Sequence, residues 1–558
     1  MGFIPYFSAY FTGMNRFAIL LLLSISAASC NSPGSDTSSA VPASIDAERF
    51  VDYVKTLSSD KFLGRKPFTE GDTLTVTYIA EEFKRIGLEP ANGDSFFQEV
   101  PLVEIASHPL TSLTFEKGES QFSLDHLDDY VIGSQWLNER IEIAETDVVF
   151  AGFGIVAPEY GWNDYDGLDA VGKTVTVLVN DPGFYDSSLF KGDTMTYYGR
   201  WTYKFEEAAR QGATGVLIIH DTDAASYGWN VVRSGWTGPQ LSLQTTDNGA
   251  SRAAFEGWLS AAAAEKLFEL AGGADSLIAR AKKPGFKPVD LGIKTSVSLK
   301  STFRKSASNN VLAKLRGSKY PDEYIIYTAH WDHLGVGEAI DGDSIYNGAI
   351  DNASGIAALF ELAHAFKSAA TPPERSILFL AVTAEEQGLL GSAYYASNPV
   401  YPLDKTVANI NIDALSPIGK TRDIAVIGLG QSDMDDYATR AASRLGREVV
   451  PGGNPSAGSF FRSDHFNFAK VGVPALYMGT GRDVIGKDSS IAAGLRDAFA
   501  KRYHHVSDEY DDTWDISGMV ADIQLAFDVG YTLSRERAFP QWKAGSEFKA
   551  IGERRFEM

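Results

Sequence analysis

The sequence predicts an α/β protein in which helices sandwich a central, mostly parallel sheet and a smaller α/β domain is inserted into the chain. Three observations support this. The chain has 558 residues, too many for one hydrophobic core. From Asn310 onward, strand-like and helix-like runs alternate, which is typical of a parallel sheet covered by helices. Residues 131–300 instead hold short strands and few helices, which indicates a separate small domain.

The N-terminus has the layout of a secretory signal. Arg16 precedes an apolar run over 17–25, and small residues then lead to Cys30. The run is too short to cross a bilayer as a mature helix. Residues 1–30 are therefore expected to be a signal peptide. Residues 31–43, rich in Ser, Pro, Gly and Thr, are expected to be a flexible tether.

The expected elements follow from the spacing of apolar residues. In the first part of the main domain, 44–130, they are helices at 47–57 and 72–86 and strands at 99–105 and 113–115. In the insert, 131–300, they are strands at 148–156, 173–179 and 215–219, a helix at 203–211 and a surface loop at 227–238. In the second part, 301–558, they are strands at 324–329, 376–383, 407–412 and 473–478 and helices at 354–367, 433–445 and 516–534.

Charge and cysteine content exclude several classes of function. The formal net charge is −22, and such a field repels nucleic acid, so no nucleic-acid partner is expected. Cys30 is the one cysteine, which excludes an internal disulfide and a zinc site built from several thiolates.

Chemically active side chains follow three predicted strands of the second part. His330 follows the first, Glu385 and Glu386 follow the second, and Asp413 follows the third. The carboxyl ends of parallel strands meet at one edge of a sheet, where sites form. Two adjacent charges directly after an eight-residue apolar run are unusual, because burying a charge is costly unless it is paired.

Two loops add further candidates. Asp351 lies in the glycine-bounded stretch 348–355 that leads into a helix, and His504 and His505 lie near the C-terminus. Two imidazoles and three carboxylates form a donor set suited to zinc or a neighbouring divalent metal. Five ligands are too many for one tetrahedral ion. They fit two ions about 3.5–4 Å apart that share one carboxylate.

Four runs resemble the co-catalytic zinc exopeptidase family, peptidase family M28, which includes bacterial aminopeptidases, glutamate carboxypeptidases, the transferrin receptor and, more distantly, glutaminyl cyclases. These runs are 328–335, 348–355, 383–392 and 503–510. Residues 57–65 resemble the family's opening helix and loop, and the insert resembles its protease-associated domain. The resemblance covers nearly the whole chain after the tether and implies the zinc peptidase fold.

The resemblance also implies roles for individual residues. The implied metal ligands are His330, Asp351, Glu386, Asp413 and His504. One zinc ion would take His330 and Asp413, the other Glu386 and His504, and Asp351 would bridge the two. Glu385 would be the general acid/base. Asp332 would fix the tautomer of the His330 imidazole.

Some assignments stay open at this point. His504 is preferred over His505 because Tyr503 and the run 508–510 fit the family frame of Tyr-His, three residues, then Asp-Glu-Tyr. The segment 463–465 is either a wall of the substrate pocket or a structural loop. His333 and His364 are expected to be structural.

The resemblance implies a zinc-dependent exopeptidase, an aminopeptidase that releases N-terminal residues from peptide substrates. The alternatives are a carboxypeptidase or dipeptidase, which would need carboxylate-binding arginines such as Arg462 or Arg482, a glutaminyl cyclase, or an inactive binding homologue. The complete set of five ligands argues against the last two.

The small residues that end in Cys30 resemble a bacterial lipobox. This implies an exported protein that a lipid on Cys30 anchors to the membrane of the bacterial cell envelope. The alternative is a plain cleaved signal followed by an incidental cysteine.

Overall fold

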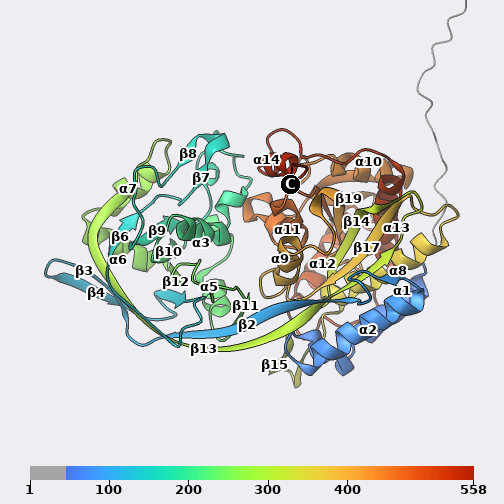
Figure 1. The fold of residues 1–558 in the computed structure, drawn as a ribbon, viewed down its shortest axis with the longest axis horizontal. Coiled ribbons are helices and arrows are strands. Elements are labelled where there is room, and N and C mark those ends of the chain that lie inside the picture. Colours follow the sequence, from blue (N-terminus) through green and yellow to red (C-terminus); the bar gives the residue numbers. More distant parts are fainter. Residues whose placement is uncertain (1–44, 558) are drawn as a thin grey trace, which may run out of the picture. The chain divides into compact units, whose positions relative to one another are not determined.

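A computed structural model describes residues 45–557 of the chain (Figure 1). The signal peptide and tether predicted over 1–43 lie outside these residues. Nowhere between 45 and 557 does the structure contain a helix with the length and apolar character of a membrane span.

The central sheet has a parallel core and antiparallel flanks. The core strands are β17 (Arg375–Val382), β14 (Tyr320–His330), β18 (Thr406–Asn411) and β21 (Ala475–Thr480), side by side in that order. β19 (Asp423–Ile427) runs antiparallel to β21, and β20 (Glu448–Gly452) pairs in parallel with β19. On the other flank, the end of β13 (Val289–Leu315) runs antiparallel to β17.

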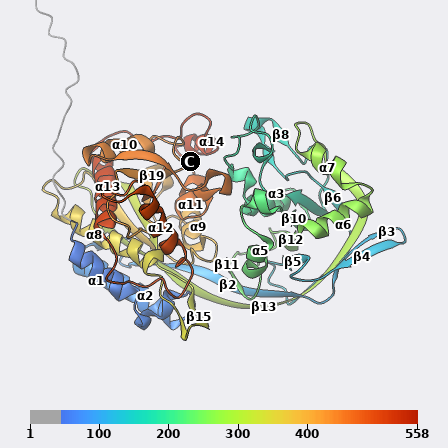
Figure 2. The ribbon, with the colours of Figure 1, turned by 180° about the vertical axis from the view of Figure 1, so that it is seen from behind.

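Helices cover both faces of this sheet, which confirms the predicted α/β sandwich. One face carries α1 (Ala47–Leu57), α2 (Glu70–Ile86), α8 (Ser354–Ser368), α10 (Met434–Arg444) and α13 (Ser517–Arg535), seen from behind in Figure 2. The other face carries α9 (Leu390–Ser397) and α11 (His465–Lys470). Along β14, Ile325 and Tyr327 pack into the first core and Ile326 into the second, because side chains alternate across a strand.

Two long antiparallel strands, β2 (Phe97–Pro109) and β13, run side by side and connect the central sheet to the insert (Figure 1). Within the insert, β6 (Arg140–Phe150), β9 (Thr174–Leu178), β10 (Gly215–Ile219) and β12 (Phe255–Leu259) pair in parallel, and β5 (Tyr130–Gly133) runs antiparallel to β12. Its helices include α3 (Trp201–Arg210), α6 (Ala261–Ala271) and α7 (Ala274–Ala281).

The remaining elements are short. They are β1 (Glu89–Pro90), β3 (Leu113–Lys117), β4 (Ser120–Leu124), β7 (Val156–Ala157), β8 (Trp162–Asn163), β11 (Gln240–Leu243), β15 (Gly335–Ile340), β16 (Asp343–Tyr346), α4 (Thr222–Ala225), α5 (Trp229–Gly235), α12 (Ser489–Ala500) and α14 (Lys549–Arg554).

The insert differs from the sequence prediction in three places. The strand expected over 148–156 stops at Phe150, because Gly152 and Gly154 adopt φ of 53° and 64° and turn the chain. The expected surface loop 227–238 contains α5. The β3–β4 hairpin precedes residue 131, yet Phe115 packs into the core of the insert.

Candidate metal centre

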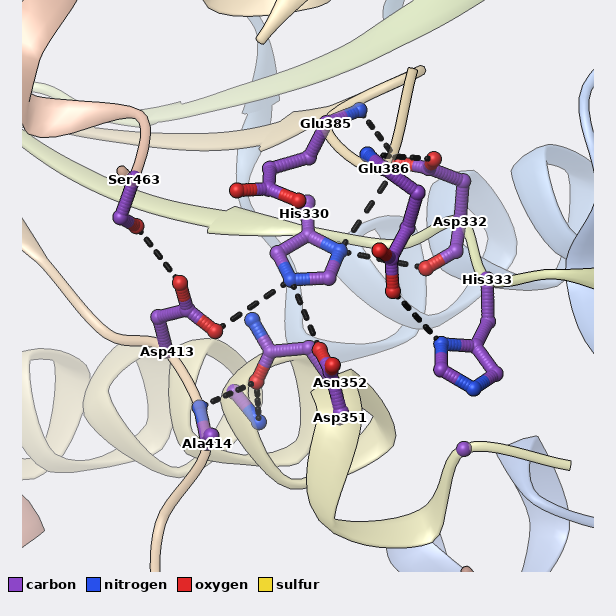
Figure 3. A network of polar contacts seen from close by, with 12 residues as sticks. His330, Asp332, His333, Asp351, Asn352, Glu385, Glu386, Asp413, Ala414 and Ser463 are labelled. Atoms are coloured by element: carbon purple, nitrogen blue, oxygen red, sulfur yellow. Dashed lines mark hydrogen bonds and ion pairs between the residues drawn. The ribbon is translucent and has the colours of Figure 1, made fainter. Parts of the chain in front are cut away.

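The ends of three strands bring the predicted site residues together (Figure 3). His330 is the last residue of β14, Glu385 and Glu386 follow β17, and Asp413 follows β18. The Nε2 atom of His330 lies 3.3 Å from Oδ1 of Asp413. The donor atoms of His330, Glu385 and Asp413 all lie within 4.8 Å of one another.

Asp351 lies between the two imidazoles. Its Oδ1 is 3.1 Å from Nε2 of His330, and its Oδ2 is 3.4 Å from Nε2 of His504. The same His504 nitrogen is 2.8 Å from Oε2 of Glu386. The donors therefore form two overlapping sets, one around His330 and Asp413 and one around His504 and Glu386, with one oxygen of Asp351 facing each set.

The adjacent histidines are clearly separated. His504 has a backbone φ of 55°, and its imidazole lies in the cluster. The Nδ1 of His505 is 2.8 Å from the hydroxyl of Ser507 instead, away from the cluster.

Three side chains hold the loop that carries Asp351. Asn352 accepts the N–H groups of Gly355 and Ala414 and donates to the carbonyl of Ile412, which ties the start of α8 to the end of β18. Buried Arg65 donates to the carbonyls of Trp331, Asn347 and Gly348. The carboxylate of Asp508 accepts the N–H groups of Ile350 and Asp351.

The positioning roles of Arg65 and Asp508 were not predicted. Both residues lie inside runs that carry the family resemblance, 57–65 and 503–510, so the signal was present in the sequence. An arginine that donates to several carbonyls is a rigid support, because a guanidinium offers five N–H donors in a fixed plane.

Asp332 and His333 act differently from expectation. The Nδ1 of His330 is 3.1 Å from the backbone carbonyl oxygen of Asp332, whereas the carboxylate of Asp332 is 3.8 Å away. That carboxylate accepts the N–H groups of Glu385 and Glu386, so it holds the loop after β17. His333, expected to be only structural, places Nδ1 2.7 Å from Oε1 of Glu386.

The segment 463–465 lies next to the centre. The Ser463 hydroxyl donates to Oδ2 of Asp413 at 2.6 Å, which orients that carboxylate. Asp464 is fully buried, and neither of its oxygens has a hydrogen-bond partner among residues 45–557. Burial raises the pKa of the Asp464 carboxyl to about 7.

The buried centre has an excess of negative charge. Burial, with the carboxylates of Asp413 and Glu386 nearby, raises the pKa of the Glu385 carboxyl well above its usual range. Burial alone would lower the pKa of the His330 imidazole, but the carboxylates of Glu385, Asp351 and Asp413 outweigh it and raise that pKa well above normal.

The donor set fits divalent cations. The carboxylates converge with imidazole nitrogens at 2.8–3.4 Å. Uncompensated buried charge is costly, and neutral imidazoles with carboxylates are donors that zinc accepts. The two overlapping donor sets have the arrangement expected of a pair of ions that share a carboxylate.

Residues 310–528 match the model of peptidase family M28. Aminopeptidase NAALADL1 of Mus musculus is 35% identical over 138 residues, covering 23% of this chain and 17% of the relative. Aminopeptidase YwaD of Bacillus subtilis (strain 168) is 32% identical over 181 residues, covering 31% of this chain and 35% of the relative. The matches therefore span only a sixth to a third of the lengths of these curated relatives.

Among solved structures, an aminopeptidase from Aneurinibacillus sp. strain AM-1 is similar with a TM-score of 0.48 and 20% sequence identity. The similarity covers 88% of this chain and 94% of that one.

Proposed function

We propose that the protein, whose residues 310–528 match the model of peptidase family M28, is a zinc-dependent exopeptidase, most simply an aminopeptidase that releases N-terminal residues from peptides. The observation that carries the proposal is the placement of Asp351, whose two carboxylate oxygens face two different imidazoles. That arrangement suits a carboxylate bridging two ions.

The proposed ligand sets follow from the contacts. His330 and Asp413 would hold one zinc ion, Glu386 and His504 the other, and Asp351 both. Such ions, when bound, make a nucleophile available from water near neutral pH and polarise the scissile carbonyl.

Glu385 is suited to move the proton. It lies within reach of His330 and Asp413 but outside the closest contacts between the proposed ligands. Its carboxylate would take the proton of the attacking water and deliver it to the leaving amine nitrogen. Asp332 would keep Glu385 in place by accepting its backbone N–H at 3.0 Å.

A second candidate, cleavage of substrates recognised by a C-terminal carboxylate, has one observation in its favour. Arg200 of the insert packs over Gly458 close to Arg462, and no ion pair joins either guanidinium to an acid within residues 45–557. Burial, with the charge of Arg462 added, lowers the pKa of Arg200 to about 10. Unpaired guanidinium groups are suited to bind a carboxylate.

One digest tests both functions. The zinc-loaded chain is incubated with a peptide in three forms: free at both ends, acetylated at the N-terminus, and amidated at the C-terminus. An aminopeptidase cleaves the free and amidated forms. Cleavage of the acetylated form alongside the free one, with the amidated form intact, would establish the second candidate and overturn the first.

Metal analysis tests the ligand assignment. His504→Ala is expected to lose about one of two bound zinc ions, whereas His505→Ala keeps both. Retention of two ions by His504→Ala would exclude that residue as a ligand.

We also propose that the protein is exported and that a lipid on Cys30 attaches it to the membrane of the bacterial cell envelope. The lipobox-like residues before Cys30 support this. Cys30→Ala, expressed as the full chain, is expected to leave the membrane fraction for the soluble one. Unchanged fractionation, with no lipid found on the wild-type cysteine by mass spectrometry, would contradict it.

A further inference from the structure

A small cavity lies beside the proposed metal centre. Its volume is about 230 Å³, and Asp351 is part of its wall. Ile350, Ala414 and Tyr503, which also line it, are the chain neighbours of the proposed ligands Asp351, Asp413 and His504. Pockets for whole small ligands span about 300–1,000 Å³. This cavity is therefore the size for one side chain rather than a whole peptide.

Helix α12 closes one side of the cavity through Arg496, Phe499 and Ala500. The helix is weakly embedded, since Ala492 is its one buried residue. Tyr503, which also lines the cavity, is 62% exposed, and Ile491 on the helix is 55% exposed.

Of the residues from 45 to 557, Arg496 is the one basic residue that lines the cavity. Its Nη1 donates to the carbonyl of Arg482 at 3.0 Å, and no ion pair joins it to an acid in the described part of the chain. The two acids in the wall are already used: Asp351 faces the imidazoles, and Asp508 accepts the backbone N–H groups of Ile350 and Asp351.

We propose that this cavity receives the N-terminal side chain of the substrate and that Arg496 is its specificity-determining residue, admitting apolar side chains and rejecting basic ones. The proposal rests on the proposed aminopeptidase function. The apolar wall made by Ile350, Ala414 and Phe499 favours an aliphatic guest, because burial removes its surface from water. A lysine guest would bring an ammonium against an uncompensated guanidinium, and such like-charge contact discriminates between ligands.

The test measures kcat/KM of the zinc-loaded full chain for p-nitroanilides of leucine, lysine and glutamate. The wild type is expected to prefer leucine to lysine. Arg496→Met is expected to raise the ratio of kcat/KM for lysine to that for leucine about tenfold, the effect of removing about 1.4 kcal/mol of repulsion. A melting temperature equal to that of the wild type shows that the variant folds.

Lys501→Met is the matched control. It removes one positive charge just beyond the end of the same helix, from an exposed side chain that does not line the cavity. An unchanged ratio of leucine to lysine in Arg496→Met, or the same change in Lys501→Met, would overturn the assignment of Arg496.

A filling variant tests the cavity itself. Ala500→Leu adds volume to its wall and is expected to lower kcat/KM for leucine several-fold more than for alanine p-nitroanilide. Equal loss for both would overturn the location of the pocket while leaving the aminopeptidase function intact. No turnover of any anilide or free peptide by the zinc-loaded wild type would overturn the function and, with it, this inference.

Discussion

The insert and the central sheet each bury a cluster of charged side chains, and the two clusters are satisfied in opposite ways. In the insert, Asp164 accepts two backbone N–H groups at 3.1 Å. Asp181 accepts the N–H group of Gly183 and both the N–H and hydroxyl groups of Thr196. Lys204 donates to the carbonyl of Asn180 at 2.8 Å. Both oxygens of Asp181, Oδ2 of Asp164 and the Asn180 carbonyl thus meet donors of the chain.

In the central sheet, carboxylates outnumber the donors that they meet. Asp351, Glu386 and Asp413 share the imidazoles of His330 and His504. In a structural buried cluster donors and acceptors balance, whereas in a binding cluster carboxylates and imidazoles converge and are suited to hold a cation from outside the chain.

The largest effect expected from this contrast is on catalysis. Glu385→Gln keeps the shape of the side chain but removes its ability to take a proton. We expect kcat to fall about 10²–10⁴-fold with the zinc content unchanged. Kinetics with parallel metal analysis check this. Loss of zinc together with activity would show that Glu385 is a ligand and not a proton carrier.

A substitution in the buried charged cluster of the insert should lower the stability of the protein and leave its catalytic activity unchanged. Lys204→Met leaves the Asn180 carbonyl without a donor and removes the cation near Asp181, so the free energy of unfolding should fall by about 3 kcal/mol. Urea denaturation measures this, and kcat/KM of the folded variant should match the wild type. Lys173→Met is the control: its pair with Asp147, at 3.9 Å, is partly exposed and contributes little. Lost activity in folded Lys204→Met would break the distinction between the clusters.

The third prediction concerns the hydroxyl group of Ser463, which orients the proposed zinc ligand Asp413. Ser463→Ala removes the hydroxyl that donates to Asp413 and should weaken zinc binding about 10–100-fold, the usual cost of losing a group that orients a metal ligand. Competition with a chelator measures the affinity. Ser459→Ala, in the same stretch of chain but bonded to Asn454, should leave it unchanged. Equal affinities in both variants would show that Asp413 needs no such support.

The sequence predicted the proposed metal ligands better than the residues that hold them in place, and the reason is physical. His330, Glu386 and Asp413 follow apolar strands of a parallel sheet, so periodicity alone places them at one edge. The support by Arg65 depends on three carbonyls brought together by tertiary packing, and a carbonyl carries no sequence signal. The role of Asp332 was misjudged for a related reason: its carboxylate binds backbone N–H groups more than fifty positions away.

The insert was harder to predict than the central sheet. The α/β alternation after Asn310 fixes which strands are parallel, whereas β13 continues through both regions and its hydrophobic pattern marks no boundary. Within the insert, Gly152 and Gly154 turn the chain inside the apolar run 148–156, which otherwise indicates one strand.

The imidazole of His465 is fully buried two residues after Ser463, which supports Asp413, and it stays neutral. Burial lowers the pKa of its imidazole from 6.5 to about 3. Between these values the unfolded chain binds one more proton than the folded chain, so the free energy of unfolding should fall as pH falls from 6.5 toward 3. The contribution of this group is about 1.4 kcal/mol per pH unit.

His465→Gln removes this contribution, so the wild type should lose stability more steeply than the variant between pH 6 and pH 5. Urea denaturation of both proteins, each stripped of zinc so that metal release does not enter, gives the two slopes. Equal slopes would mean that the folded chain protonates His465 as readily as the unfolded one.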